Sequence, residues 1–494
     1  MITELEFKSL AAQGFNRIPL LSEAFADLET PLSLYLKLAG GAKHSFLLES
    51  VVGGERFGRY SFIGLPARTL LRASGWLTEI VTDGSVVERH EGNPLDFIET
   101  YQARFKVALR PGLPRFCGGL AGYFGYDAVR YMEPKLAATV KTGGLDTPDI
   151  LLLQTEELAV IDNLSGRLYL IVYADPNQPE AYFKAKRRLT ELGDKLRYSV
   201  TVPPVRRGPS YAVEREFSKE AYLAAVHHSK ELIAAGDMMQ VQIGQRLKKR
   251  YTESPLSLYR ALRSLNPSPY MYFYDMGDFQ IVGASPEILV RHEHTPEGDK
   301  ITIRPLAGTR KRGPTEEEDN RLATELIADP KERAEHVMLV DLARNDLGRV
   351  CDYGTVQVKD LMLIERYSHV MHIVSQVEGH LSANKTPYDL MRATFPAGTL
   401  SGAPKVRAMQ IISELEQTQR GPYGGCVGYF SFSSNLDCCI TIRTALIKGG
   451  KAYVQAGGGW VNDSTPEAEY QETVNKAKAM LKAVALAESF PKWA

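Results

Sequence analysis

The chain has 494 residues, enough to bury a large core, and this length suggests two to four structural units. Lysine plus arginine and aspartate plus glutamate each number 59, so the formal net charge is zero. This balance excludes the broad basic surface that a nucleic-acid-binding protein needs. No apolar run approaches the ~20 residues that cross a bilayer, and residues 1–13 do not resemble a secretory signal. We therefore expect a cytoplasmic protein with no nucleic-acid or membrane partner, whose five scattered cysteines are buried thiols.

The first 200 residues mix short strands with helical stretches. Strands are predicted at 46–52 and 60–64, and a hairpin joins 150–162 to 166–174 about the turn Asn163-Leu164-Ser165. Residues 179–195 are charged and have helical periodicity. Prolines, a glycine and arginines then make 201–218 the best predicted linker, which divides the chain into an N-terminal unit (1–200) and a larger C-terminal unit (219–494).

After the linker, helical and strand-like segments alternate. Helices are predicted at 219–235, 318–349, 387–392, 404–418 and 466–488, and strands at 270–276, 280–285, 438–446 and 451–457. Several strands follow one another without an intervening helix, which disfavours a doubly wound sheet. The pattern predicts an α+β fold with large antiparallel sheets flanked by helices.

Two predicted helix starts carry paired acids. Glu332 and Glu335 are three residues apart and share a helix face. Glu469, Glu472 and Lys476 form one stripe on another helix, after Thr465 as a possible cap. Mg²⁺ prefers oxygen ligands and usually takes only one or two carboxylates from a protein. Two such helices could hold Mg²⁺ through Glu335 and Glu472, with Glu332 and Glu469 supporting the bound water.

The spacing of these residues also allows a purely structural role. Acids in a first turn favour the helix dipole, and Glu332 stands where a capping-box acid belongs. Glycine-containing stretches at 304–310, 395–405 and 455–461 could present N–H groups to an anion or form tight turns. Arg443, in an apolar run, needs an anion that either a structural carboxylate or a substrate could supply. His372 and Glu287 are, by spacing alone, a core histidine and a loop acid.

Six motifs in fixed order narrow these alternatives. They are GASPE, RPLAGTR, DPKERAEHVMLVDLARNDLGR, RYSHVMH, FPAGTLSGAPK and EAEYQETVNKA. Together they resemble the chorismate-utilising enzyme family over residues 215–485. LLES at 47–50 and GGERFGRYSFIG at 53–64 resemble the N-terminal region of the anthranilate synthase branch of that family.

The resemblance implies a role for each matching residue. Glu335 and Glu472 would ligate Mg²⁺, supported by Glu332 and Glu469. Glu287 would act as general acid on the departing C4 hydroxyl of chorismate, and His372 would serve the later loss of pyruvate. The resemblance further implies these substrate-binding residues: Gly308, Thr309, Thr399, Tyr423, Arg443, Gly457, Gly459 and Lys476.

Two positions separate the members of this family. Water-using members carry a lysine base where this chain has Gln240, so ammonia is the expected nucleophile. Aminodeoxychorismate synthases often carry a lysine nucleophile where this chain has Ala307, which favours direct attack by ammonia. The implied products are anthranilate and pyruvate. An aminodeoxychorismate synthase remains the alternative, because some of these enzymes also lack that lysine.

The resemblance also implies regulation and a partner. Glu49, Ser50, Asn266, Pro269, Tyr270 and Met271 would form a tryptophan feedback site. The chain shows no glutamine amidotransferase half, so a separate glutaminase subunit would supply ammonia. A non-catalytic scaffold and a Mg²⁺-dependent phosphoryl-transfer enzyme are the other classes considered. The second lacks any phosphate-binding loop. The roles of Gln242 and Gly244 stay open.

Overall fold

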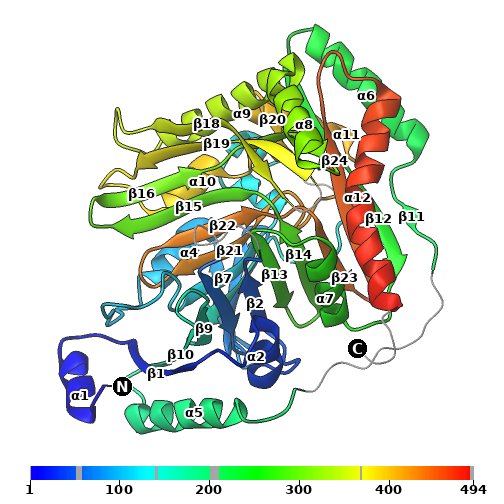
Figure 1. The fold of residues 1–494 in the computed structure, drawn as a ribbon. Helices are drawn as coiled ribbons and strands as arrows, with labels where there is room; N and C mark the ends of the chain where they lie inside the picture. Colours follow the sequence, from blue (N-terminus) through cyan, green and yellow to red (C-terminus); the bar gives the residue numbers. More distant parts are fainter. Residues whose placement is uncertain (1, 52–57, 139–142, 201–210, 368–369, 490–494) are drawn as a thin grey trace.

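The computed structural model describes residues 2–51, 58–138, 143–200, 211–367 and 370–489. Val52 of the first predicted strand, residues 53–57, most of the predicted linker (201–210) and two residues of the RYSHVMH motif (368–369) lie outside the described residues. All strand pairings between named strands in the described chain are antiparallel, and they build two twelve-stranded sheets (Figure 1). The predicted α+β class with large antiparallel sheets is confirmed.

The first sheet combines strands from both halves of the sequence. Its path is β1 (Ile18–Phe25), β10 (Arg167–Ala174), β9 (Glu157–Asp162), β3 (Tyr60–Gly64), β2 (Ser45–Glu49), β13 (Tyr270–Asp275), β14 (Phe279–Ser285), β23 (Thr444–Lys448), β24 (Lys451–Trp460), β12 (Gln240–Arg250) and β11 (Glu214–Arg215), with β20 (Gly402–Ala403) beside β12.

The second sheet also combines strands from both halves of the sequence. Its path is β17 (Leu306–Lys311), β19 (Val370–His380), β16 (Gly298–Ile303), β15 (Ile288–Thr295), β22 (Leu436–Ile440), β21 (Cys426–Ser431), β7 (Gly119–Phe124), β8 (Ile150–Thr155), β4 (Thr69–Ser74), β5 (Leu77–Thr82) and β6 (Ser85–Glu91), with β18 (Gln357–Arg366) beside β19. Strand β2 pairs with β13, and β7 pairs with β21. Strands from both sides of the predicted boundary at 201–218 therefore lie in the same sheets.

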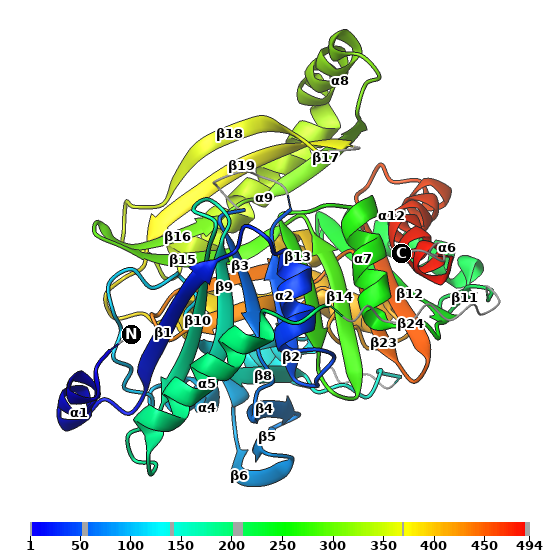
Figure 2. The same ribbon diagram turned by 60° about the horizontal axis from the view of Figure 1, so that its bottom comes forward.

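Most helices lie along the outer faces of the sheets, whereas α1 projects beyond β1, as Figures 1 and 2 show. The helices are α1 (Glu4–Ala12), α2 (Pro31–Leu38), α4 (Pro94–Gln102), α5 (Ala181–Lys195), α6 (Lys219–Ala234), α7 (Pro255–Leu265), α8 (Glu316–Ala328), α9 (Pro330–Gly348), α10 (Pro387–Thr394), α11 (Lys405–Leu415) and α12 (Pro466–Glu488), with the 3₁₀ turns η1 (Tyr126–Tyr131), η2 (Pro134–Leu136) and η3 (Gly398–Leu400). Six of these helices begin with proline, whose fixed φ suits a first turn and whose missing N–H costs no helical bond there.

Hydrophobic side chains fill three layers. One cluster lies between the sheets, and the other two large clusters lie between each sheet and its helices. Strand β8 shows how the sequence achieves this. Leu151 and Leu153 join the cluster between the sheets, whereas Ile150 and Leu152 join the helix-facing cluster. Because both faces are buried, the run reads as continuously apolar.

Several predicted elements are divided in the structure. The strand predicted at 150–162 is β8 and β9, which lie in different sheets, and only β9 forms the hairpin with β10. The strand predicted at 438–446 is β22 and β23, again in different sheets. The helix predicted at 318–349 breaks at Asp329, which caps α9 through the N–H groups of Lys331 and Glu332. The predicted cap Thr465 makes no side-chain hydrogen bond at the start of α12.

All five cysteines are buried and unpaired, as predicted. No helix in the described ranges is long and apolar enough to span a membrane.

Candidate active site

Two neighbouring crossings between the sheets carry Glu287 and Arg443. One crossing joins β14 to β15, and the other joins β22 to β23. The crossings are hydrogen-bonded to each other, because Ile440 N donates to Glu287 O at 3.0 Å and Ala284 N donates to Arg443 O at 3.1 Å. Pairing of the backbone therefore brings the predicted acid and the predicted carboxylate-binding cation together.

Arg443 is held in an unusual conformation. Its φ is +49°, in the left-handed region that non-glycine residues seldom adopt. Burial lowers the pKa of its guanidinium, while Tyr367 and Glu287 act in the opposite direction. The side chain makes no hydrogen bond or ion pair with the residues that the structure describes. A partly buried cation without a paired carboxylate is suited to bind an anionic ligand.

Glu287 is a carboxyl group that keeps its proton at neutral pH. Its side chain is buried, and burial raises its pKa to about 8, against the lowering effects of Thr399, Arg443 and Lys476. The family resemblance assigned this residue the role of proton donor, and its environment gives it a proton to donate.

His372 is fixed in one tautomer. Strand β17 bulges between Ala307 and Arg310, which displaces Gly308 and Thr309 from the ladder with β19. His372 Nδ1 donates to the carbonyl oxygen of Gly308 at 2.8 Å and lies 3.1 Å from the Thr309 hydroxyl. Nδ1 therefore carries the proton, and Nε2, which is buried with no partner in the described chain, carries the lone pair. Burial lowers the pKa of His372 to about 4, so the ring is neutral.

The two predicted acid pairs meet at the ends of α9 and α12. Burial raises the pKa of Glu335, and the charges of Glu332 and Glu472 raise it further, although Gln240 lowers it. Gln240 Nε2 donates to Glu335 Oε1 at 3.1 Å. The pKa of Glu469 is raised by burial and by Glu472, although a bond to Ser464 lowers it. Residues that lie more than a hundred positions apart thus form one acidic centre.

Lys476 and the glycine strand close one side of this centre. Lys476 pairs with Glu472 at 2.7 Å and donates to the carbonyl of Gly457 at 3.0 Å. Side chains at Gly458 and Gly459 would crowd the carboxylates and their neighbours, because added Cβ atoms would lie 3.2 Å from Glu469 Oε2 and 2.6 Å from Gln240 Nε2. Their lack of side chains lets β24 approach the carboxylates closely.

Tyr423 packs against Gly244 of β12, the strand that pairs with the glycines of β24. Burial raises its pKa to about 12, and both Arg420 and the Gln242 side chain lower it. A Cβ added at Gly457 would lie 2.9 Å from the Gln242 amide atoms. Gln242 thus connects Tyr423 with the strand that carries Gly457.

The acidic centre fits a divalent cation that takes few ligands from the protein. No group of three or more His, Cys, Asp or Glu side chains in the described ranges could hold a metal ion by itself. Mg²⁺, however, commonly takes only one or two carboxylates and completes its shell with water and substrate oxygens. Glu469 Oε2 is buried without a hydrogen-bond partner in the described chain, and burial together with the charges of Glu332 and Glu472 raises the pKa of Glu335. A bound cation would give Glu469 Oε2 a partner and would reduce the repulsion around Glu335.

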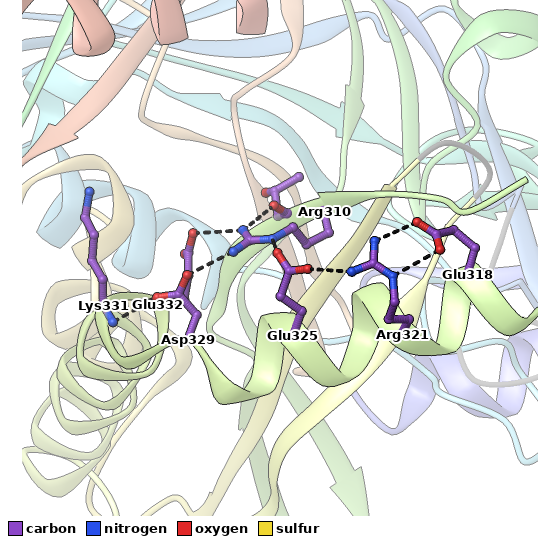
Figure 3. Close-up of polar contacts among 8 residues, drawn as sticks. Arg310, Glu318, Arg321, Glu325, Asp329, Lys331 and Glu332 are labelled. Carbon is purple, nitrogen blue, oxygen red and sulfur yellow. Dashed lines mark hydrogen bonds and ion pairs between the residues drawn. The ribbon is translucent and has the colours of Figure 1, made fainter.

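Arg310 forms ion pairs at the start of α9. The sequence did not predict this role, although Arg310 is the last residue of the RPLAGTR motif. Its guanidinium contacts Asp329 at 2.9 Å, Glu332 at 3.4 Å and Glu325 at 3.4 Å. Figure 3 shows it between these carboxylates, with Arg321 bridging Glu325 to Glu318 one to two turns earlier in α8. Arg310 follows Thr309 directly, so the network ties the bulge beneath His372 to the helix that carries Glu335.

A separate cavity lies between the sheets, on the β2–β13 pair. Five of the six residues predicted for a tryptophan site line it: Glu49, Ser50, Pro269, Tyr270 and Met271. Asn266 does not line it and instead ends α7, with its N–H donating to Leu262. The Glu49 carboxylate accepts from Tyr259 at 2.5 Å and from Arg263 Nε at 2.7 Å.

The fold and the site define an enzyme of one family. A family model described as chorismate binding enzyme matches residues 62–482, and the chain belongs to this family. It is 54% identical to anthranilate synthase component 1 of Neisseria meningitidis serogroup A over 491 residues, covering 99% of both chains. It is also 53% identical to the protein of that name from Pseudomonas aeruginosa, covering 98% of each chain.

Solved structures agree with this assignment. Anthranilate synthase component I from Streptococcus pneumoniae is 36% identical, with a TM-score of 0.76 over 92% of this chain and 98% of that one. The menaquinone-specific isochorismate synthase of Escherichia coli, at 19% identity, shares the fold with a TM-score of 0.71. The predicted family is confirmed.

Proposed function

We propose that this chain is the chorismate-converting component of an anthranilate synthase, forming anthranilate and pyruvate from chorismate and ammonia. The observation that carries the proposal is the 54% identity, over 99% of both chains, with anthranilate synthase component 1. The site supports it, because it combines cations for a dicarboxylate, a protonated carboxyl group and a neutral imidazole.

In the first step, ammonia adds to C2 of chorismate as the C4 hydroxyl leaves as water. Arg443 and Lys476 hold the substrate carboxylates, Glu287 gives its proton to the departing oxygen, and the ammonium group formed at C2 loses one proton to become the amine. Ala307, at the position where some relatives carry a lysine nucleophile, is a small buried residue in β17, paired with Ile373. Free ammonia is therefore the nucleophile.

In the second step, the amino intermediate loses its C2 proton and expels pyruvate, which leaves an aromatic ring. His372 Nε2 has the free lone pair that this proton transfer requires. Its proton on Nδ1 stays bonded to Gly308, so the ring keeps its orientation.

Glu335 and Glu472 would hold Mg²⁺ directly, with Glu332 and Glu469 bonding to its water molecules. Bound there, the ion would withdraw charge from the ring through the substrate carboxylate. We also propose that a glutamine amidotransferase subunit supplies the ammonia, and that L-tryptophan inhibits by binding in the cavity beside Glu49 and Ser50. The name "component 1" of the relatives supports a second component.

The test is a product assay of the purified chain with chorismate, Mg²⁺ and ammonium. We expect fluorescent anthranilate and an equal amount of pyruvate. A non-aromatic amino product without pyruvate would instead identify an aminodeoxychorismate synthase. Adding L-tryptophan to the same assay tests the inhibition.

A further inference from the structure

A buried ion pair outside the predicted site connects the strands and loops that form it. Arg420 is 2% exposed and Glu416 is 6% exposed. Arg420 Nη2 lies 2.6 Å from Glu416 Oε1, and its Nε lies 2.9 Å from Glu416 Oε2. Removing two charges from water is costly, so a pair buried this deeply needs further hydrogen bonds to satisfy it.

Those further bonds all go to the backbone of site elements. Arg420 Nη1 donates to Leu400 O at 2.7 Å, next to Thr399, and Nη2 donates to Gln242 O at 2.7 Å. Glu416 Oε1 accepts from Gly244 N at 2.7 Å. The pair therefore fixes the η3 turn and the middle of β12 to each other.

The same pair supports Tyr423. The Arg420 guanidinium carbon lies 4.3 Å from the centre of the Tyr126 ring and 5.6 Å from that of Tyr423. Gly244 packs against this tyrosine, because an added Cβ would lie 3.1 Å from Tyr423 Cε1 and 3.4 Å from Glu416 Oε1. This contact explains why position 244 is a glycine, whose role the sequence alone left open.

We propose that Glu416 and Arg420 are positioning residues, which hold Tyr423, Gln242 and the Thr399 turn in the geometry that binds the substrate carboxylates. The inference rests on the proposed function, since that function makes Tyr423 and Thr399 residues that bind chorismate. Neither member of the pair touches the reacting atoms. Their effect is on substrate affinity, through the strands and loops they join.

The experiment compares Arg420→Lys and Glu416→Gln with a second, largely buried ion pair that also involves β12. Lys249 and Glu488 lie 2.7 Å apart, with side chains 6% and 12% exposed, at the end of β12 remote from Gln240. Lys249→Met and Glu488→Gln are the matched controls. We expect all four variants to unfold at lower temperature, but only the first two to raise KM for chorismate, by ~10-fold or more, with a smaller change in kcat. Misplacement by about 1 Å is enough for losses of this order.

Gly244→Ala tests the same geometry without breaking the ion pair. Its added methyl group presses on Tyr423, so KM should again rise. Gly193→Ala, in α5 with no atom within 4 Å of the added Cβ, is its control. An unchanged KM in Gly244→Ala and in folded Glu416→Gln would overturn the positioning role. If the wild-type chain itself forms no anthranilate, the proposed function fails instead.

Discussion

His372 donates a hydrogen bond from Nδ1 to the carbonyl oxygen of Gly308 at 2.8 Å. Gly308 has a φ of +68°, and a Cβ added there would lie 3.1 Å from Glu332 Oε2. The bulge in β17 therefore does two things. It sets the tautomer of the histidine, and it leaves space for a carboxylate of the proposed metal site. The backbone of this bulge thus contacts both the His372 ring, which would move a proton, and Glu332 of the proposed Mg²⁺ site.

The first prediction concerns His372→Asn. The amide nitrogen of asparagine can replace Nδ1 as donor to Gly308, but nothing replaces the lone pair on Nε2. We expect chorismate consumption to continue while release of anthranilate and pyruvate falls by ~10²-fold or more, the usual contribution of a general base. Chromatography of the reaction mixture should show a non-aromatic amino product.

His90→Asn is the control for this experiment, because His90 stacks on Phe97 in an unrelated part of the fold. Equal losses of chorismate consumption and anthranilate formation in His372→Asn would contradict a role confined to the second step.

The second prediction is a pH dependence set by Glu287. The pKa of this carboxyl group is raised to about 8, so it is protonated below that pH and loses its proton above it. An acid is needed in the protonated form, so kcat should fall as pH rises through about 8. The rates must be compared at equal concentrations of free ammonia, since ammonia itself titrates.

Glu287→Gln should lower activity by ~10²- to 10⁴-fold, because glutamine has no proton to transfer. Its residual activity should lack the fall above pH 8. If the alkaline fall persists unchanged in this variant, another group is responsible for it.

Local signals predicted the starts of the important helices. Asp329 and Pro330 mark the start of α9, and the three-residue spacing placed Glu332 and Glu335 on one face. The meeting of these acids with Glu469 and Glu472 depends on contacts between distant parts of the chain, which spacing cannot reveal. From the residues alone a shared Mg²⁺ site was one of two open interpretations, and the resemblance to a family favoured it over a purely structural role.

The sequence pattern did not predict the crossings between the sheets. Residues 438–446 begin and end with apolar residues and contain no glycine or proline, so the run looks like one strand. Its division is decided by pairing with β15 and β14, which lie in different sheets. For the same reason the unusual backbone of Arg443 could not be predicted. Arg420 and Glu416, four residues apart, resemble an ordinary surface pair until the structure shows them buried.

The third prediction tests the metal site. Glu472→Gln removes one of the two proposed direct ligands and leaves Lys476 without its ion pair. Both side chains are about half exposed, so the fold should tolerate the change. We expect loss of Mg²⁺-dependent activity with an unchanged circular dichroism spectrum. Glu467→Gln, at an exposed position in the first turn of the same helix, should leave activity unchanged. Full activity of Glu472→Gln would exclude this residue as a ligand.

The fourth prediction concerns the cavity between the sheets. Ser50 lines it and follows Glu49, whose carboxylate is fixed by Tyr259 and Arg263. Ser50→Ala removes a hydroxyl group from the proposed tryptophan site but nothing from the acidic centre. Loss of one hydrogen bond to a charged ligand, worth ~1.5–3 kcal/mol, should raise the half-inhibitory tryptophan concentration by at least about tenfold. The kcat and KM for chorismate should stay at wild-type values.

Ser22→Ala, at a half-buried position in β1, controls for the loss of a serine hydroxyl. Inhibition that is equally strong in Ser50→Ala and Ser22→Ala would place the inhibitor elsewhere.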